Sequence, residues 1–299
     1  MTKPFIRVKN LTKDYGHGRG VFNISLQVGE GECYGFLGPN GAGKTTTIRH
    51  MMGFSKPQIG RCTVLGSDCL KNAAELKNVI GYLPGEVALP AGLTGEGFLK
   101  MTLKMHGCSD DSFCRQLLER FELKADKKTR EMSLGEKRKL AIVAAFMHDP
   151  RILILDEPTS GLDPVMQQEF INFVKEEKER GKTIFLSSHI FSEVDAVCDR
   201  IAIIKDGMIV SEFKADELRK TQDSIYVIRF EDKESYEIFK EKGYIITADS
   251  EERLKIKARV PLKQLNAFVR DMAPLHIKSF HQAKFSLEDY FMDFYKEVK

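Results

Sequence analysis

Short continuous apolar runs recur along the first 220 residues and predict strands that are covered on both faces. Helical segments lie between them, such as 167–180, which ends at Gly181. Strands that alternate with helices predict an α/β fold with a largely parallel sheet. The runs expected to form its buried strands are 33–37, 151–155, 183–186 and 200–204.

Two further patterns add subdomains to this core. Residues 5–11 and 21–28 have strand patterns and flank a glycine-rich turn at 16–20, which predicts an N-terminal antiparallel β subdomain. Residues 88–148 are mainly helical in pattern, with Thr94 as a plausible N-cap, so we expect a helical subdomain there.

Residues 221–299 have a different pattern and predict an accessory α+β domain after a core domain of residues 1–220. The predicted order β-α-β-β-α-β is the split βαβ pattern of ferredoxin-like domains. A last helix is expected from Ser286, with Asp289 as its capping partner. These residues leave open whether the domain regulates, dimerises or only stabilises the protein. The predicted strands are 225–230, 244–247, 254–258 and 276–280, and the predicted helices are 233–240 and 262–272.

Composition argues against several classes of protein. The 46 basic and 43 acidic residues are interleaved and give a formal net charge of +3, so no nucleic-acid partner is expected. The longest apolar run, 140–147, is far shorter than the roughly 18 to 20 residues of a membrane-spanning helix. Arg7 and Lys9 interrupt any N-terminal secretory signal. The six cysteines contain no C-x-x-C pair, which favours buried thiols in a reducing compartment.

The segment from Gly38 to Thr46 reads G-P-N-G-A-G-K-T-T and matches the phosphate loop G-x-x-x-x-G-K-[ST]. A chance glycine-rich turn is the alternative, but a predicted strand before the segment and a predicted helix after it favour the phosphate loop. Lys44 is expected to contact the β- and γ-phosphates of ATP, and Thr45 to bind Mg²⁺ through its hydroxyl. The predicted nucleotide-binding residues of this loop are Gly38, Pro39, Asn40, Gly41, Ala42, Gly43, Lys44, Thr45 and Thr46.

Two adjacent carboxylates follow the apolar run 151–155. Neighbouring strand residues face opposite sides, so Asp156 and Glu157 can serve one site only where the strand ends, and Pro158 favours that end. Asp156 is expected to hold Mg²⁺, commonly through its water shell. Glu157 is expected to orient and deprotonate the attacking water. An ordinary turn is the alternative, and the phosphate loop upstream favours the catalytic interpretation.

With these motifs the chain resembles the nucleotide-binding subunits of ABC transporters. The resemblance covers residues 5 to about 215 and depends mainly on the phosphate loop and on I-L-I-L-D-E-P-T-S-G-L-D at 152–163. It implies that Asp163 lies in a loop that crosses to a partner subunit. It also implies that His189, in L-S-S-H, senses the γ-phosphate and that Tyr15 stacks on adenine.

Two segments depart from the family pattern. Met132-Ser133-Leu134-Gly135-Glu136 stands where the family has L-S-G-G-Q, so Ser133 and Gly135 are retained at a helix start that would face the partner's γ-phosphate. Such relaxed forms are similar to those of drug- and sodium-export ATPases. In the loop 80–86, Gly85 fills the place of the usual glutamine, and whether Glu86 replaces that glutamine stays open.

The resemblance implies an ATPase that uses ATP and Mg²⁺ and closes as a homodimer, or as a heterodimer with a second ATPase subunit. An integral-membrane permease would be its partner, placing the chain at the cytoplasmic face of the cell membrane, and the resemblance favours an exporter. One alternative is a soluble relative that acts on ribosomes or DNA, but the chain has a single phosphate loop and no sustained heptads. The other alternative is a P-loop kinase, in which residues 133–136, the counterpart of the family's signature sequence L-S-G-G-Q, would have no role. The transported substrate would contact the permease, so this sequence does not identify it.

Overall fold

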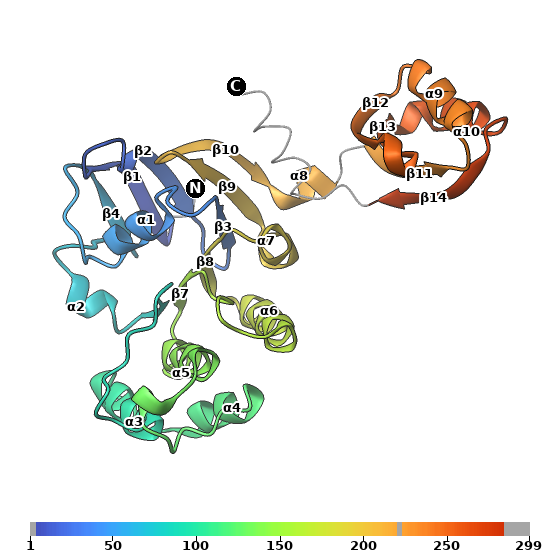
Figure 1. The fold of residues 1–299 in the computed structure, drawn as a ribbon. Coiled ribbons are helices and arrows are strands. Elements are labelled where there is room, and N and C mark those ends of the chain that lie inside the picture. Colours follow the sequence, from blue (N-terminus) through green and yellow to red (C-terminus); the bar gives the residue numbers. More distant parts are fainter. Residues whose placement is uncertain (1–3, 220–222, 284–299) are drawn as a thin grey trace. The chain divides into compact units, whose positions relative to one another are not determined.

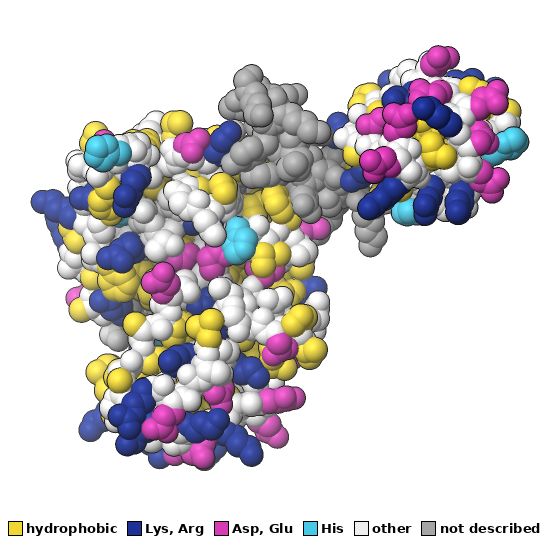
Figure 2. All heavy atoms as spheres, in the orientation of Figure 1, with side chains coloured by type: hydrophobic (Ala, Val, Ile, Leu, Met, Phe, Trp, Pro, Cys, Tyr) yellow, Lys and Arg dark blue, Asp and Glu magenta, His cyan; other side chains and the backbone are white. Residues whose placement is uncertain are grey.

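The computed structural model describes residues 4–219 and 223–283. The chain divides into two compact units, Met1–Ala215 and Asp216–Lys299. No helix among the described residues is long and apolar enough to cross a membrane. Figure 2 shows acidic and basic side chains interspersed on the visible face of each unit, as the balanced charge predicts.

The first unit contains two sheets (Figure 1). The smaller sheet has the order β2-β1-β4-β5 and antiparallel pairing, which confirms the predicted N-terminal β subdomain. Its strands pack apolar side chains such as Ile6, Val8 and Ile24 into the core. The strands are β1 (Ile6–Asp14), β2 (Gly20–Val28), β4 (Ile59–Val64) and β5 (Ser67–Asp68).

The larger sheet has the order β10-β9-β3-β8-β7-β6 and is parallel except where β10 pairs with β9. The predicted apolar strands form its centre, because every residue of β3, β7 and β8 is buried. The α/β fold with a largely parallel sheet is therefore confirmed. The strands are β3 (Cys33–Leu37), β6 (Ile80–Leu83), β7 (Ile152–Asp156), β8 (Thr183–Ser188), β9 (Arg200–Lys205) and β10 (Met208–Lys214).

One segment expected to be a loop is a strand. Ile80–Leu83 forms β6 and pairs in parallel with β7, opposite residues 152–155. Gly81 permits this packing, because a Cβ there would lie 2.2 Å from the Ala145 carbonyl oxygen of the neighbouring helix. The loop itself is therefore restricted to the residues after Leu83.

Three helices, α3, α4 and α5, gather on one side of the first unit and form the helical subdomain (Figure 1). Thr94 is the N-cap of α3, as predicted, and accepts a hydrogen bond from the Gly97 N–H. The helix expected at 167–180 begins earlier, at Pro164, because Asp163 caps it. The helices of this unit are α1 (Lys44–Met51), α2 (Ala73–Leu76), α3 (Gly95–Met105), α4 (Ser112–Arg120), α5 (Leu134–Phe146), α6 (Pro164–Glu179) and α7 (Phe191–Val197), and α8 (Ala215–Arg219) spans the boundary with the second unit.

The second unit has the predicted order β-α-β-β-α-β. Its antiparallel sheet, β12-β13-β11-β14, is the split βαβ arrangement of ferredoxin-like domains. Tyr236, Phe239 and Phe268 from its helices pack on one face of this sheet. The helix predicted from Ser286 lies outside the described residues. The elements are β11 (Asp223–Phe230), α9 (Lys233–Glu241), β12 (Ile245–Ser250), β13 (Lys255–Pro261), α10 (Leu265–Met272) and β14 (Ile277–Ala283).

Candidate active site

The phosphate loop joins the buried strand β3 to helix α1. Gly41 and Gly43 have φ values of 83° and 107°, a left-handed region that favours glycine. At Gly38 a Cβ would lie 2.3 Å from the Ile204 carbonyl oxygen, so the loop can approach β9 only without a side chain. No side chain caps α1, so the N–H groups of its first turn can bind an anion.

Lys44 connects this loop to the end of β7. Its side chain is only 5% exposed, and its ammonium donates to the carbonyl oxygens of Gly38 at 2.6 Å and Pro39 at 3.0 Å. The same nitrogen lies 3.0 Å from Glu157 Oε1. The loop therefore holds the cation at its centre, facing a catalytic candidate.

The two predicted metal ligands are in direct contact. Thr45 Oγ1 donates to Asp156 Oδ2 at 2.8 Å, and the Asp156 side chain is fully buried at the end of β7. Ser187 on β8, which the sequence did not single out, donates its hydroxyl to the other oxygen, Oδ1. A hydroxyl beside a buried carboxylate is a donor set that suits Mg²⁺, so these residues fit the expected metal.

Glu157 follows Asp156 and turns out of the strand. It has a φ of 47°, and its N–H donates to the Ser187 carbonyl oxygen at 3.0 Å. One carboxylate oxygen lies against Lys44, and the other is 2.6 Å from His189 Nδ1. The structure therefore brings together Glu157, the predicted base, with Lys44 and His189, both of which are predicted to contact the γ-phosphate.

A hollow of about 700 Å³ lies beside the loop. Tyr15, which the resemblance predicts to stack on adenine, borders it and is 53% exposed. Arg19 also borders the hollow, although the sequence suggested only a glycine-rich turn there. The residues around it are Tyr15, Arg19, Gly20, Asn40, Gly41, Gly43, Lys44, Thr45, Thr46 and Glu157.

The predicted signature residues do not border this hollow. Ser133 caps α5: its hydroxyl accepts from the Glu136 N–H at 3.2 Å, while its own N–H donates to Glu136 Oε2 at 2.8 Å. A hydrogen bond from Lys127 and these bonds to Ser133 lower the pKa of Glu136 to about 2. The glutamate that departs from the family pattern therefore completes a capping box.

The other signature residues lie close to the loop that precedes α6. A Cβ on Gly135 would lie 3.3 Å from the Gly161 carbonyl oxygen, and Leu134 is 71% exposed beside it. Asp163 accepts hydrogen bonds from the N–H groups of Val165 and Met166, and the bond from Met166 is the main cause of its lowered pKa. The residues that the resemblance assigns to the partner contact therefore lie at the N-terminal ends of α5 and α6, here called the signature tip.

In the loop after β6, Gly85 stands where the family usually has a glutamine. Gly85 approaches the Asp156 carboxylate so closely that a Cβ there would lie 3.2 Å from Asp156 Oδ2. Glu86 is exposed. Gly85 therefore occupies the position beside Asp156 with its backbone.

Glu193 on α7 is a buried acid that the sequence did not reveal. It accepts hydrogen bonds from the hydroxyls of Thr159 and Ser188, which flank the ends of β7 and β8. Burial is the main cause of its raised pKa. No motif marks it, because its role depends on contacts between distant segments.

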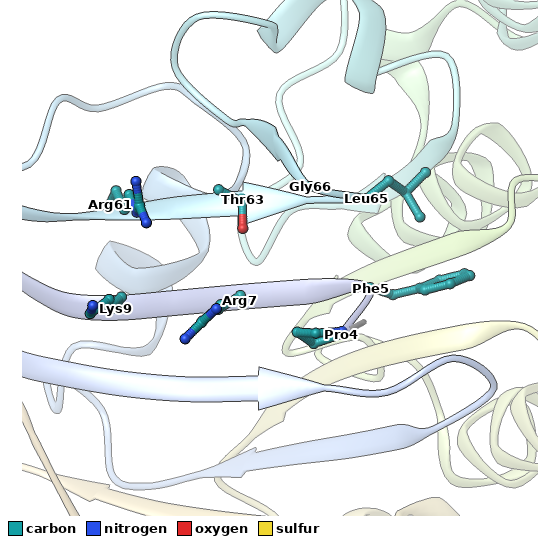
Figure 3. Close-up of a pocket in the computed structure, with 8 residues that line it drawn as sticks. All are labelled: Pro4, Phe5, Arg7, Lys9, Arg61, Thr63, Leu65 and Gly66. Carbon is teal, nitrogen blue, oxygen red and sulfur yellow. The ribbon is translucent and has the colours of Figure 1, made fainter. Parts of the chain in front are cut away.

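A second groove lies on the open face of the smaller sheet and shares no residue with the phosphate-loop hollow. Figure 3 shows its basic side chains on two neighbouring strands, with Lys9 paired opposite Arg61. None of the predicted site residues lies there. The lining residues are Pro4, Phe5, Arg7, Lys9, Arg61, Thr63, Leu65 and Gly66.

Known proteins share this arrangement of segments. The sequence pattern of the family described as "ABC transporter" matches residues 21–160. The bacitracin transport ATP-binding protein BcrA of Bacillus licheniformis is 39% identical over 218 residues, which cover 72% of this chain and 71% of that protein. The linearmycin resistance ATP-binding protein LnrL of Bacillus subtilis is 38% identical over 211 residues, which cover 69% of this chain and 68% of that protein.

Solved structures agree with these relatives. The structure of an ATP-binding subunit of an ABC transporter is 30% identical with a TM-score of 0.66, and the match covers 72% of this chain and 92% of that chain. A dimeric, post-hydrolysis ATP-binding cassette bound to ADP and Pi is 25% identical with a TM-score of 0.63, covering 70% of this chain and 98% of that chain.

Proposed function

Because this chain belongs to the ABC transporter family as an ATP-hydrolysing subunit, we propose that it uses Mg²⁺-ATP to power export through a separate membrane permease. The proposal depends mainly on one observation: beside the phosphate loop, the Glu157 carboxylate contacts both Lys44 and His189. Lys44 would contact the phosphates, Glu157 the attacking water and His189 the γ-phosphate, all within the same site.

Each group has a role that follows from its surroundings. The triphosphate would lie on the N–H groups of the loop and compete with Glu157 for the Lys44 ammonium. Thr45 and Asp156 would hold Mg²⁺, which neutralises charge on the phosphate oxygens. Glu157, released from Lys44, would accept a proton from the attacking water, while His189 holds its other oxygen.

The site is proposed to be completed by a second ATPase subunit. Ser133, Gly135 and Asp163 lie outside the hollow, at a tip that can face the nucleotide of another copy. The dimeric cassette bound to ADP and Pi supports such an interface. Closure over ATP and separation after hydrolysis would move the permease, as in other γ-phosphate switches.

Export is the direction that the relatives support. BcrA is named for bacitracin transport, LnrL for linearmycin resistance, and a further relative, 36% identical over 212 residues, for Nod factor export in Burkholderia orbicola. We therefore propose that the chain acts at the cytoplasmic face of the membrane, bound to a permease.

Co-purification from native membranes in mild detergent tests this function. We expect a multi-span membrane protein to accompany the chain, and ATP turnover to persist in the complex. Recovery with ribosomes or nucleic acid, and without a membrane protein, would contradict the proposal. The variant Lys44→Ala, which should bind ATP more weakly, should still recover the permease, which separates assembly from catalysis.

A further inference from the structure

Arg138 lies in helix α5, close after the Ser133 cap, and its side chain is only 2% exposed. We infer that Arg138 is a positioning residue that links the loop after β6 to the catalytic segment after β7. The inference rests on the proposed function and adds a residue that connects two segments of the ATPase site.

All three guanidinium nitrogens donate to backbone carbonyl oxygens at the end of β7 or in the loop after β6. Nε donates to Pro158 at 2.8 Å, and Nη2 donates to Asp156 at 3.0 Å and to Glu157. Nη1 donates to Pro84 at 2.5 Å and to Gly85 at 3.2 Å. One rigid group therefore holds both segments against the first turns of α5.

The chemistry of arginine suits this task. A guanidinium is planar and carries five N–H donors in a fixed fork, so it can hold two segments in register. A lysine ammonium is a single point charge on a flexible stem and cannot reproduce that geometry. Burial is the main cause that lowers the pKa of Arg138 to about 10, while Asp156 and Glu157 favour its charged form. The group therefore stays charged at neutral pH.

The contacts place Arg138 behind the catalytic carboxylate. Glu157 has a left-handed backbone, and its carbonyl oxygen accepts from Arg138 while its carboxylate lies between Lys44 and His189. Any rotation of that backbone would displace the carboxylate. Holding the carbonyl oxygen therefore fixes where the general base lies.

The Arg138 guanidinium also connects the loop after β6 to the segment that carries the general base. Gly85 replaces the glutamine whose side chain, by family resemblance, would approach the metal and water. Here Pro84 and Gly85 share the Arg138 guanidinium with Asp156 and Glu157. A shift of this loop, or of the signature tip of α5, would reach the general base through this guanidinium.

Arg138→Lys in the full chain tests the inference, with Arg120→Lys as the matched control. Arg120 joins α4 to α6 through ion pairs with Glu169 and Glu176, and neither partner belongs to the site. We expect Arg138→Lys to lower kcat about 10- to 100-fold, as small misplacements of catalytic groups do, while the Kd for ATP changes less than about 3-fold because the phosphate loop is intact. Arg120→Lys should leave kcat close to wild type.

Chemical rescue separates positioning from simple loss of structure. Added guanidinium ion should restore part of the kcat of Arg138→Ala but none of the activity of Glu157→Gln. An unchanged kcat in Arg138→Lys, with wild-type turnover present, would overturn the inference and leave the proposed function standing. Absence of turnover in the wild type would instead refute the proposed function.

A measurement on the wild-type chain covers the case in which Arg138 variants do not fold. Hydrogen exchange of the amides of Gly85 and Glu86 and of the non-proline residues in 156–160 should change together when ATP binds. Independent changes in the two segments would overturn the inference.

Discussion

Glu157 illustrates how much one side chain depends on its neighbours, because a lysine and a histidine hold its two oxygens. Replacing it with glutamine keeps the shape but removes the basic oxygen. We expect Glu157→Gln to bind ATP normally, lose about 10²- to 10⁴-fold in kcat, and accumulate as a nucleotide-bound dimer on size-exclusion chromatography. Glu179→Gln, an exposed change on α6, is the control. Normal turnover by Glu157→Gln would remove this residue from the role of general base.

Lys44 is the second residue whose loss has a definite outcome. Its ammonium is the one cation held inside the phosphate loop by Gly38 and Pro39. Lys44→Ala should raise the Kd for ATP by at least about 10-fold, as expected for loss of a charge-assisted contact of about 1.5–3 kcal/mol. Fluorescent nucleotide titration measures the change, and an affinity equal to that of the wild type would contradict the site.

A third prediction concerns acid stability and not catalysis. His148 stacks on His106 with ring centroids 3.8 Å apart, and burial is the main cause that lowers the pKa of His148 from 6.5 to about 4. The folded state therefore favours neutral His148, so its contribution to stability is present above pH 6.5 and is lost as the pH falls from 6.5 towards 4. We expect it to amount to about 1–2 kcal/mol, after a reduction for solvent screening.

Urea unfolding at pH 7 and pH 5 measures this effect. His148→Phe, which preserves a stacked ring, should lose less stability between the two pH values than the wild type does. His17→Asn is the control, because His17 is exposed and asparagine tolerates its positive φ. An equal pH dependence in the wild type and in His148→Phe would show that this histidine is not responsible.

At the scale of elements, α5 begins with a capping box that we assign two functions. Ser133→Ala should destabilise the protein by about 1 kcal/mol through loss of the cap, and should also reduce turnover if the helix tip faces a partner's nucleotide. Thr94→Ala removes the corresponding cap of α3 and is the matched control. Thr94→Ala should lose similar stability but keep turnover. Equal turnover in the two variants would mean that Ser133 only caps the helix and has no role in the partner's site.

Elements differ in how far the sequence predicts them, for a physical reason. The strands β3, β7 and β8 were predictable because burial on both faces requires an uninterrupted apolar run. Ile80–Leu83 is also a strand, but its glycine and the Pro-Gly that follows resemble a turn. Only its neighbours explain it, since the Ala145 carbonyl oxygen leaves no space for a Cβ at Gly81.

The residues of the site also differ in how far the sequence predicts them. Lys44, Thr45, Asp156 and Glu157 belong to motifs with a fixed local spacing, so the sequence alone predicts roles for them. Other site-supporting residues act through contacts across long stretches of chain, which no spacing records: Arg19, Arg138, Ser187 and Glu193.

At the scale of the whole molecule, the central question is whether each site is shared between two chains. A chain with Lys44→Ala keeps the signature tip but lacks the lysine that contacts the phosphates, whereas a chain with Ser133→Arg keeps an intact phosphate loop but cannot complete the partner's site. Neither variant should hydrolyse ATP by itself. If two copies pair and share sites, a mixed dimer contains one site in which both halves are intact.

An equal mixture of the two variants should therefore recover about a quarter of the wild-type rate, because random pairing places half of the chains in mixed dimers with one complete site each. The recovered rate should fall on dilution, as the dimers separate. Lys44→Ala mixed with Glu157→Gln is the control, since no pairing of these chains joins an intact phosphate loop to an intact general base. If the first mixture shows only the sum of its parts while the wild type remains active, two copies of this chain do not share their sites.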